Sequence, residues 1–139
     1  MSNTVMNISA KTKLYWRAAL EVIDAAGDYA AVRKLRANWL DKDTAWKVDG
    51  VVNEYYQGSL LVLDEAIGAR KQTFYGKVEK FNILCAQYET LPIIRPDKLL
   101  DLLLDEKRRK SFRGKIERRR DKDIICPLQE FEQNKRRGR

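Results

Sequence analysis

The chain has 139 residues and a net charge of +8, and 44% of its residues are hydrophobic. This length predicts a single globular unit with a core of its own, and the hydrophobic content excludes a wholly disordered chain. Two cysteines and no histidine exclude a structural zinc site, which needs four such ligands, and they also exclude a histidine base.

No part of the sequence is apolar over the length of a membrane span. The longest apolar runs, residues 60–63 and 102–104, are far shorter than the ~20 residues that a spanning helix needs. The first residues also lack the apolar core of a signal peptide. We therefore expect no membrane span and no secretion, and a location in the cytoplasm, in a nucleoid or nucleus, or in a virion. Two reduced cysteines agree with such a compartment.

The N-terminal part of the chain predicts two helices joined at a glycine. Apolar residues recur every three or four positions in residues 10–26, as on one side of an α-helix. Gly27 is a suitable residue to end that helix, and Asp28 can cap the next one. The second helix has its own apolar side and is expected to end at the polar residues 41–43.

Two more helices are expected before residue 95. A third helical pattern begins at Thr44 and ends at Gly68, and a fourth has its apolar side in residues 74–88. Few segments alternate apolar and polar residues, so strands are not expected. The predicted fold class is therefore all-α, and residues 1–95 are expected to form a compact helical bundle of about four helices.

The composition changes after two prolines. Pro92 and Pro96 bracket a short extended linker, and Asp97 can cap a Leu-rich and Arg-rich fifth helix that continues to residue 120. Gly114 is the position where that helix is expected to be weakest. A short C-terminal helix is expected at residues 127–133.

Positive charge is concentrated in the C-terminal arm, residues 96–139. Its residues 107–120, the basic run, contain nine basic side chains and one acidic one, a net charge of +8. Such an excess of one sign repels itself and needs an anionic partner, and Arg binds phosphate with a planar fork of donors. The predicted nucleic-acid-binding residues are Lys107, Arg108, Arg109, Lys110, Arg113, Lys115, Arg118, Arg119 and Arg120, with Lys135, Arg136, Arg137 and Arg139 as auxiliary contacts.

The composition of the basic run also predicts the kind of nucleic acid. It has no Asn or Gln to read base edges, so its contacts are expected to go to phosphates with little sequence preference. Phe112 is its only aromatic residue, too few for a platform that stacks single-stranded bases. The expected partner is duplex DNA or structured RNA, bound for packaging, architecture or regulation. The protein is expected to act as a homo-oligomer or within a larger nucleoprotein assembly.

Three other interpretations are open on the sequence. The Leu-rich start of the fifth helix favours a protein–protein interaction module (an adaptor, inhibitor or assembly factor) that docks its basic helix on an acidic partner. Residues 30–56 can be drawn as a helix-turn-helix, although that segment is nearly neutral. Asp97, Asp105 and Lys107 match a short nuclease pattern but fall on one predicted helix. With no catalytic motif elsewhere, we expect a protein that is not an enzyme and has no cofactor or metal.

Overall fold

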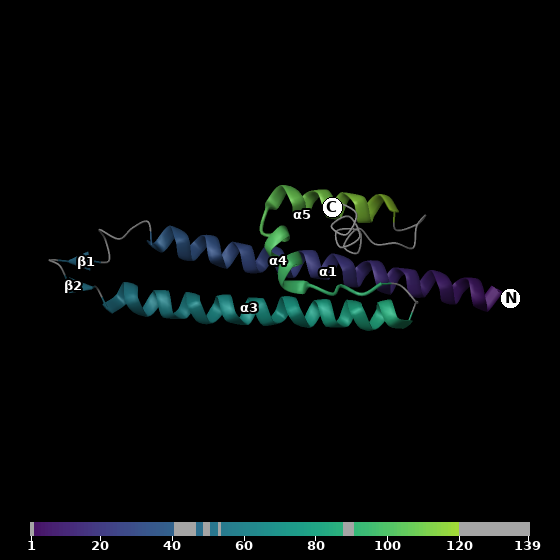
Figure 1. Cartoon of the computed structure of the whole chain (residues 1–139), viewed down its shortest axis with the longest axis horizontal. Coiled ribbons are helices and arrows are strands. Elements are labelled where there is room, and N and C mark those ends of the chain that lie inside the picture. Colours follow the sequence, from purple (N-terminus) through teal and green to yellow (C-terminus); the bar gives the residue numbers. More distant parts are fainter. Residues whose placement is uncertain (1, 41–46, 49–50, 53, 88–90, 120–139) are drawn as a thin grey trace.

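Two long helices lie side by side and form the frame of the structure, a computed structural model that describes residues 2–40, 47–48, 51–52, 54–87 and 91–119. They are α1 (Ser2–Leu40) and α3 (Glu54–Gln87), and they run in opposite directions (Figure 1). Two shorter helices follow, α4 (Pro96–Leu103) and α5 (Glu106–Arg119). The prediction of an all-α fold is confirmed at this level, apart from one very short pair of strands.

The contact between α1 and α3 is built from apolar residues at the spacing of a coiled coil. Tyr15, Val22 and Tyr29 of α1 are buried at intervals of seven residues, as are Phe74 and Phe81 of α3. The rings of Tyr15 and Phe81 lie 5.2 Å apart between centroids. A seven-residue repeat keeps the apolar side of each helix facing the other over these residues. The repeat explains why the two helices pair there.

A short antiparallel hairpin lies between the two long helices in the chain. Its strands are β1 (Lys47–Val48) and β2 (Val51–Val52). The prediction of a helix that begins at Thr44 is therefore wrong, and the second helix of the drawn helix-turn-helix does not form there. An Asp-Gly pair at residues 49–50 separates the strands in the sequence, and such a pair between β-branched residues is a hairpin signal. That signal outweighs the helical spacing of the valines.

Neither Gly27 nor Gly68 ends a helix, which corrects the two helix ends predicted there. Helices α1 and α3 continue through these positions, so two predicted helices merge into one in each case. Glycine costs a helix only ~1 kcal/mol relative to alanine, and a helix that is packed elsewhere along its length can accommodate that cost. A Cβ at Gly27 would lie 3.4 Å from Nε of Arg109, so this glycine gives room to α5. At Gly68 a Cβ would meet nothing within 4 Å.

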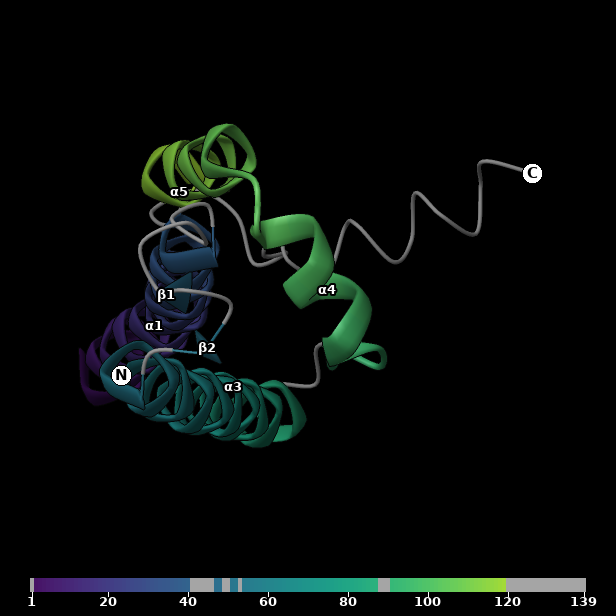
Figure 2. The same cartoon turned by 90° about the vertical axis from the view of Figure 1, so that its left-hand side faces the viewer.

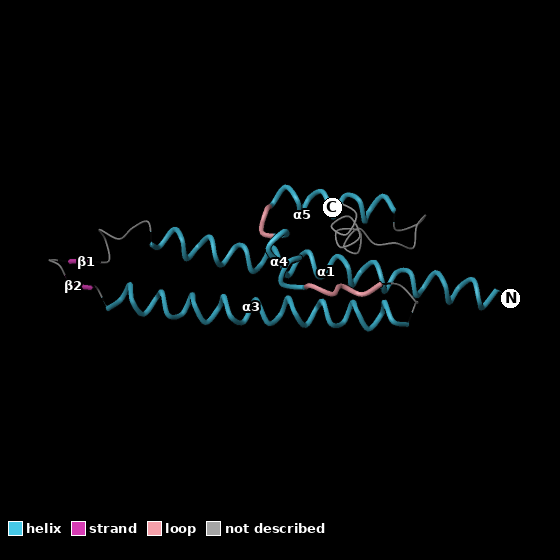
Figure 3. The backbone as a smooth tube through the Cα atoms, in the orientation of Figure 1, coloured by secondary structure: helices cyan, strands magenta, loops and turns pink. Residues whose placement is uncertain are grey.

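The predicted fifth helix is divided in two by a turn at Leu104 and Asp105. The carboxylate of Asp105 accepts a hydrogen bond from the backbone nitrogen of Lys107 at 3.0 Å, as an N-cap of α5 does. The prediction of one helix that is capped by Asp97 and continues to residue 120 is therefore wrong, since α4 already begins at Pro96 and ends at Leu103. Gly114, the expected weak point, lies inside α5. The turn changes the direction of the chain, so that α5 runs along α1 instead of continuing from α4 (Figure 3).

One asparagine fixes the linker between α3 and α4. The backbone nitrogen of Ile93 donates to Oδ1 of Asn82 at 2.7 Å, and Nδ2 of Asn82 donates to the carbonyl of Ile93 at 3.0 Å. Residues 91–95 form no helix, as the two prolines predict. Within the described residues, no helix is long and apolar enough to cross a membrane. The short helix predicted at residues 127–133 lies outside the described residues.

The hydrophobic core lies where α4 packs on both long helices and α5 packs on α1. Figure 2 shows α4 beside the helix pair and α5 beyond α1. It combines residues 15–29 of α1 and 74–85 of α3 with Leu99, Leu103 and Ile116 of the shorter helices. In residues 30–40 and 58–73, by contrast, every residue is exposed or only partly buried. The boundary predicted between residues 95 and 96 stays a prediction about independent folding, and side chains from both sides of it share this core.

Candidate nucleic-acid interface

Helix α5 contains most of the basic run and turns one side toward α1 (Figures 1 and 2). Ile116 on that side is fully buried, and Arg109, Phe112 and Arg113 are partly buried. These residues recur at intervals of three and four, so they form a single stripe along the helix. The stripe divides the basic residues into a set that faces the protein and a set that faces solvent.

Arg109 belongs to the set that faces the protein. Its Nη1 donates to the carbonyl oxygens of Leu103 at 2.7 Å and Leu104 at 2.9 Å, at the end of α4. The last carbonyls of a helix lack partners within the helix, and a cation beside them also complements the helix dipole. The same side chain passes over Gly27 of α1. Arg109 therefore caps α4 and joins α4, α5 and α1, which differs from the phosphate contact that its sequence predicts.

Two further cations of α5 have partners in this chain. Arg113 forms an ion pair with Asp24, which holds the middle of α5 on α1. The ammonium of Lys115 lies 5.8 Å from the ring centroid of Phe112, a cation–π distance. Such a contact is worth ~0.5–1 kcal/mol at an exposed site, so Lys115 can exchange it for a phosphate.

The outer side of α5 is lined by exposed cations, which are Lys107, Arg108, Lys110 and Arg118. Arg108 lies 3.8 Å from Asp105, and Lys110 lies 3.5 Å from Glu106, and all four side chains are exposed. Exposed pairs contribute at most ~1 kcal/mol, so an incoming phosphate can replace the carboxylate. Within the described residues, no acid lies within ion-pair distance of Lys107 or Arg118.

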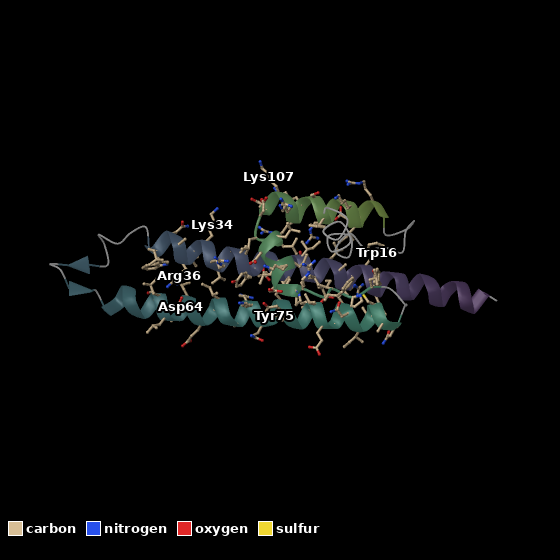
Figure 4. All side chains as sticks on the ribbon, viewed as in Figure 1. Trp16, Lys34, Arg36, Asp64, Tyr75 and Lys107 are labelled. Atoms are coloured by element: carbon tan, nitrogen blue, oxygen red, sulfur yellow. The ribbon has the colours of Figure 1, made fainter. Side chains whose placement is uncertain are left out.

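Helix α1 adds one cation on the same side of the molecule. Lys34 follows Gly27 by seven residues, so it lies on the side of α1 that contacts Arg109. It is exposed, and it projects toward the same edge as Lys107 (Figure 4). Arg36, two positions later, instead pairs with Asp64 across the two long helices (Figure 4). Lys34 is not among the residues predicted from the sequence, because only its place beside the start of α5 distinguishes it from other exposed lysines.

The acids of the described residues do not gather into a metal site. No group of three or more acidic, cysteine or histidine side chains comes together within the part of the chain that the structure describes. Asp97 lies in the first turn of α4 and Asp105 caps α5, so the nuclease-like pattern is spread over two helices.

Glu21 pairs with Lys77 at 2.8 Å and with Lys80 at 3.6 Å. The hydrogen bond from Lys77 lowers the pKa of Glu21, against a smaller opposing effect of burial. This cluster ties α1 to α3.

Not every predicted contact falls within the described residues. Arg119 is the last residue of α5, whereas Arg120, Lys135, Arg136, Arg137 and Arg139 lie outside the described residues.

The apolar anchors expected for docking on an acidic protein are used within this chain, because Leu99, Leu100 and Leu103 are buried in its core.

Comparisons with protein-family models, with curated proteins and with solved structures find no match to this chain. The interpretation of α5 therefore depends on its charges, its exposure and its contacts. These distinguish an inner stripe that stabilises the fold from an outer side that is open to an anionic ligand.

Proposed function

We propose that this protein binds duplex nucleic acid, DNA or structured RNA, through the outer side of α5, and that it is not an enzyme. The main support for the proposal is that the cations of the basic run fall into two sets on opposite sides of α5. Its inner cations have structural partners, whereas Lys107, Arg108, Lys110 and Arg118 are exposed along one helix. Exposed cations gain most from phosphate, because each one that contacts the backbone releases counterions.

The length of the outer side supports contact with one stretch of a duplex. From Lys107 to Arg118 the helix rises about 17 Å, about half a turn of B-DNA. No Asn or Gln lies in the basic run, so the contacts are directed to phosphates. We therefore expect unrelated duplexes to differ in binding free energy by less than ~1.4 kcal/mol, a factor of ten. The protein would act in packaging, architecture or regulation, wherever nucleic acid is present in the cytoplasm, a nucleoid, a nucleus or a virion.

Salt-dependent binding tests the proposal directly. Fluorescence anisotropy with labelled 20-base-pair DNA and RNA duplexes, at several salt concentrations, gives the slope of log K against log salt. Six phosphate contacts made by one chain predict a slope near −5 on DNA for each α5 that contacts the duplex. The double variant Lys107→Ala/Arg118→Ala should flatten the slope by about 2 for each α5 that contacts the duplex, because each contact contributes ~0.9.

A matched control removes the same charge elsewhere. Arg70 and Lys71 of α3 are also exposed, and Arg70→Ala/Lys71→Ala should leave the slope unchanged. Equal losses in the two double variants would mean that net charge, and not α5, attracts the duplex. Absence of binding at low salt, together with an acidic protein that co-purifies with the chain, would replace the proposal by the protein-docking alternative.

A further inference from the structure

One face of the long helix pair is left uncovered. Helix α4 lies on one side of the plane through α1 and α3, and no described helix lies on the other side (Figure 2). A shallow groove of about 470 Å³ opens there, with Leu14 and Glu21 of α1 and Gly76, Lys80 and Ile83 of α3 in its walls. We call this side of the helix pair the open face.

Large apolar side chains lie at both ends of the open face. Leu14 and Ile83, in the groove, are 52% and 54% exposed. Leu35 follows Leu14 by three heptads, so both lie along one side of α1. Val62 precedes Ile83 by three heptads, so both lie along one side of α3. Leu35 and Val62 are 48% and 64% exposed. Four exposed apolar side chains therefore occupy the two ends of one face, which is a feature of interaction surfaces.

The order of large and small residues on the open face is self-complementary in an antiparallel pair. The heptad line of α3 reads Val62, Ala69, Gly76, Ile83, which is large, small, small, large in either direction. In an antiparallel pair of such lines, each large residue meets a large one at the ends, and the small residues meet in the middle. A Cβ at Gly76 would meet nothing within 4 Å in this chain, so a second helix can approach closely there.

The two helices of one chain share the same centre of this pattern. The midpoint between Leu14 and Leu35 lies next to residue 25, and the midpoint between Val62 and Ile83 lies next to residue 73. Glu21 of α1 pairs with Lys77 of α3, and the two helices run in opposite directions. Residue 25, four positions after Glu21, therefore lies opposite residue 73, four positions before Lys77. A single two-fold axis at this level exchanges both pairs of apolar residues at once, as an isologous interface requires.

Charge complementarity favours the same arrangement. An antiparallel second copy would bring its exposed Glu65 level with Lys80, which lies 3.6 Å from Glu21 of its own chain and is still 61% exposed, so it can pair with both acids. Glu21, which would be level with Asp28 of the second copy, is already paired with Lys77. Two helices side by side over 21 residues offer a face of about 32 Å by 20 Å, close to the ~800 Å² per partner of a standard interface.

We infer that the open face binds a second copy of this chain, antiparallel to the first, and that the protein is a two-fold symmetric dimer. Sedimentation velocity of the full chain, freed of nucleic acid by nuclease and high salt, measures this state directly. The wild-type chain should sediment with the mass of two chains. Val62→Asp or Ile83→Asp should give one chain, because a buried unpaired carboxylate is costly.

The neighbouring residue supplies a matched control. Leu61 is 61% exposed and next to Val62, but it precedes Asn82 by three heptads, and Asn82 holds the linker to α4. Leu61 therefore lies off the open face, and Leu61→Asp should leave the dimer intact. Circular dichroism checks that each variant folds, which is expected since all three side chains are exposed. A wild-type monomer at high concentration, or equal dissociation of the Leu61→Asp variant, would overturn the inference.

Disulfide cross-linking tests the orientation of the two copies. In a Cys126→Ser background, the double variant Val62→Cys/Ile83→Cys should form a cross-linked dimer under mild oxidation. The two positions lie about 32 Å apart along α3, so they cannot form a disulfide within one chain. Val62→Cys alone should stay uncross-linked. Rapid cross-linking of that single variant would show parallel pairing and would contradict the antiparallel arrangement.

Discussion

Replacing Arg109 by alanine should separate the structural cations of α5 from those that bind nucleic acid. The change removes two hydrogen bonds to the carbonyls of Leu103 and Leu104 and leaves the end of α4 without its cap. A hydrogen bond from a charged group contributes ~1.5–3 kcal/mol, and both bonds here come from one partly buried group, so we expect a loss of about 2–4 kcal/mol. At ~3–4 °C per kcal/mol for a chain of this size, the melting temperature should fall by about 10 °C.

Two measurements on the same variants make the test sharp. Thermal unfolding followed by circular dichroism should show the loss for Arg109→Ala and almost none for Lys107→Ala, whose side chain is exposed. The slope of log K against log salt should respond in the opposite way, with no change for Arg109→Ala at a temperature where it is folded. An Arg109→Ala variant that melts like the wild type and flattens the salt slope would refute the assignment of this side chain as a cap.

Three sets of substitutions test the packing of the helices. Leu103→Ala should cost ~2–5 kcal/mol in urea unfolding because the side chain is fully buried, whereas Leu61→Ala, at an exposed position, should cost less than ~0.5 kcal/mol. Gly68→Ala should stabilise the protein by up to ~1 kcal/mol, and Gly27→Ala should gain less, because its Cβ would lie 3.4 Å from the Arg side chain of α5. Glu21 has a lowered pKa in the folded protein, so its pairing stabilises the fold above the ordinary value of 4.5 and loses that effect as the pH falls through the lowered pKa. The stability difference between wild type and Glu21→Gln should therefore be present at pH 7 and disappear in acid; a constant difference would contradict this account.

Apolar spacing predicted the helical segments better than it predicted their ends. The seam of α1 and α3 can be read from Tyr15, Val22, Phe74 and Phe81, because burial on one side of a helix leaves a regular pattern. Gly27 was misread as a helix end, because the room it gives to α5 is a tertiary contact that no local pattern reveals. The hairpin, in contrast, had a local signal in the Asp-Gly pair between its two strands.

The roles of neighbouring cations could not be read from the sequence at all. Lys107 and Arg109 lie two positions apart in a run of one charge, yet one is exposed and the other caps α4. The turn at Asp105 decides this, since it fixes which side of α5 meets α1. An Asp followed by Glu at the start of a basic helix is a capping signal, and it would have located the turn. Which cations then face inward depends on the packing of Ile116.

If both proposals hold, the dimer places two basic helices on one edge. Arg109 lies at Gly27 and Arg113 at Asp24, so the middle of α5 is level with residues 24–27 of α1, close to the inferred two-fold axis. That axis stacks α1 on α1 of the second copy, so the two α5 helices lie at the same level and on the same edge. A duplex can then contact both, and the phosphate contacts of the dimer are twice those of one chain. Val62→Asp, which leaves α5 untouched, should therefore halve the slope of log K against log salt and weaken binding, while Leu61→Asp should do neither. A monomeric Val62→Asp variant with the full wild-type slope would show that each α5 binds its duplex alone.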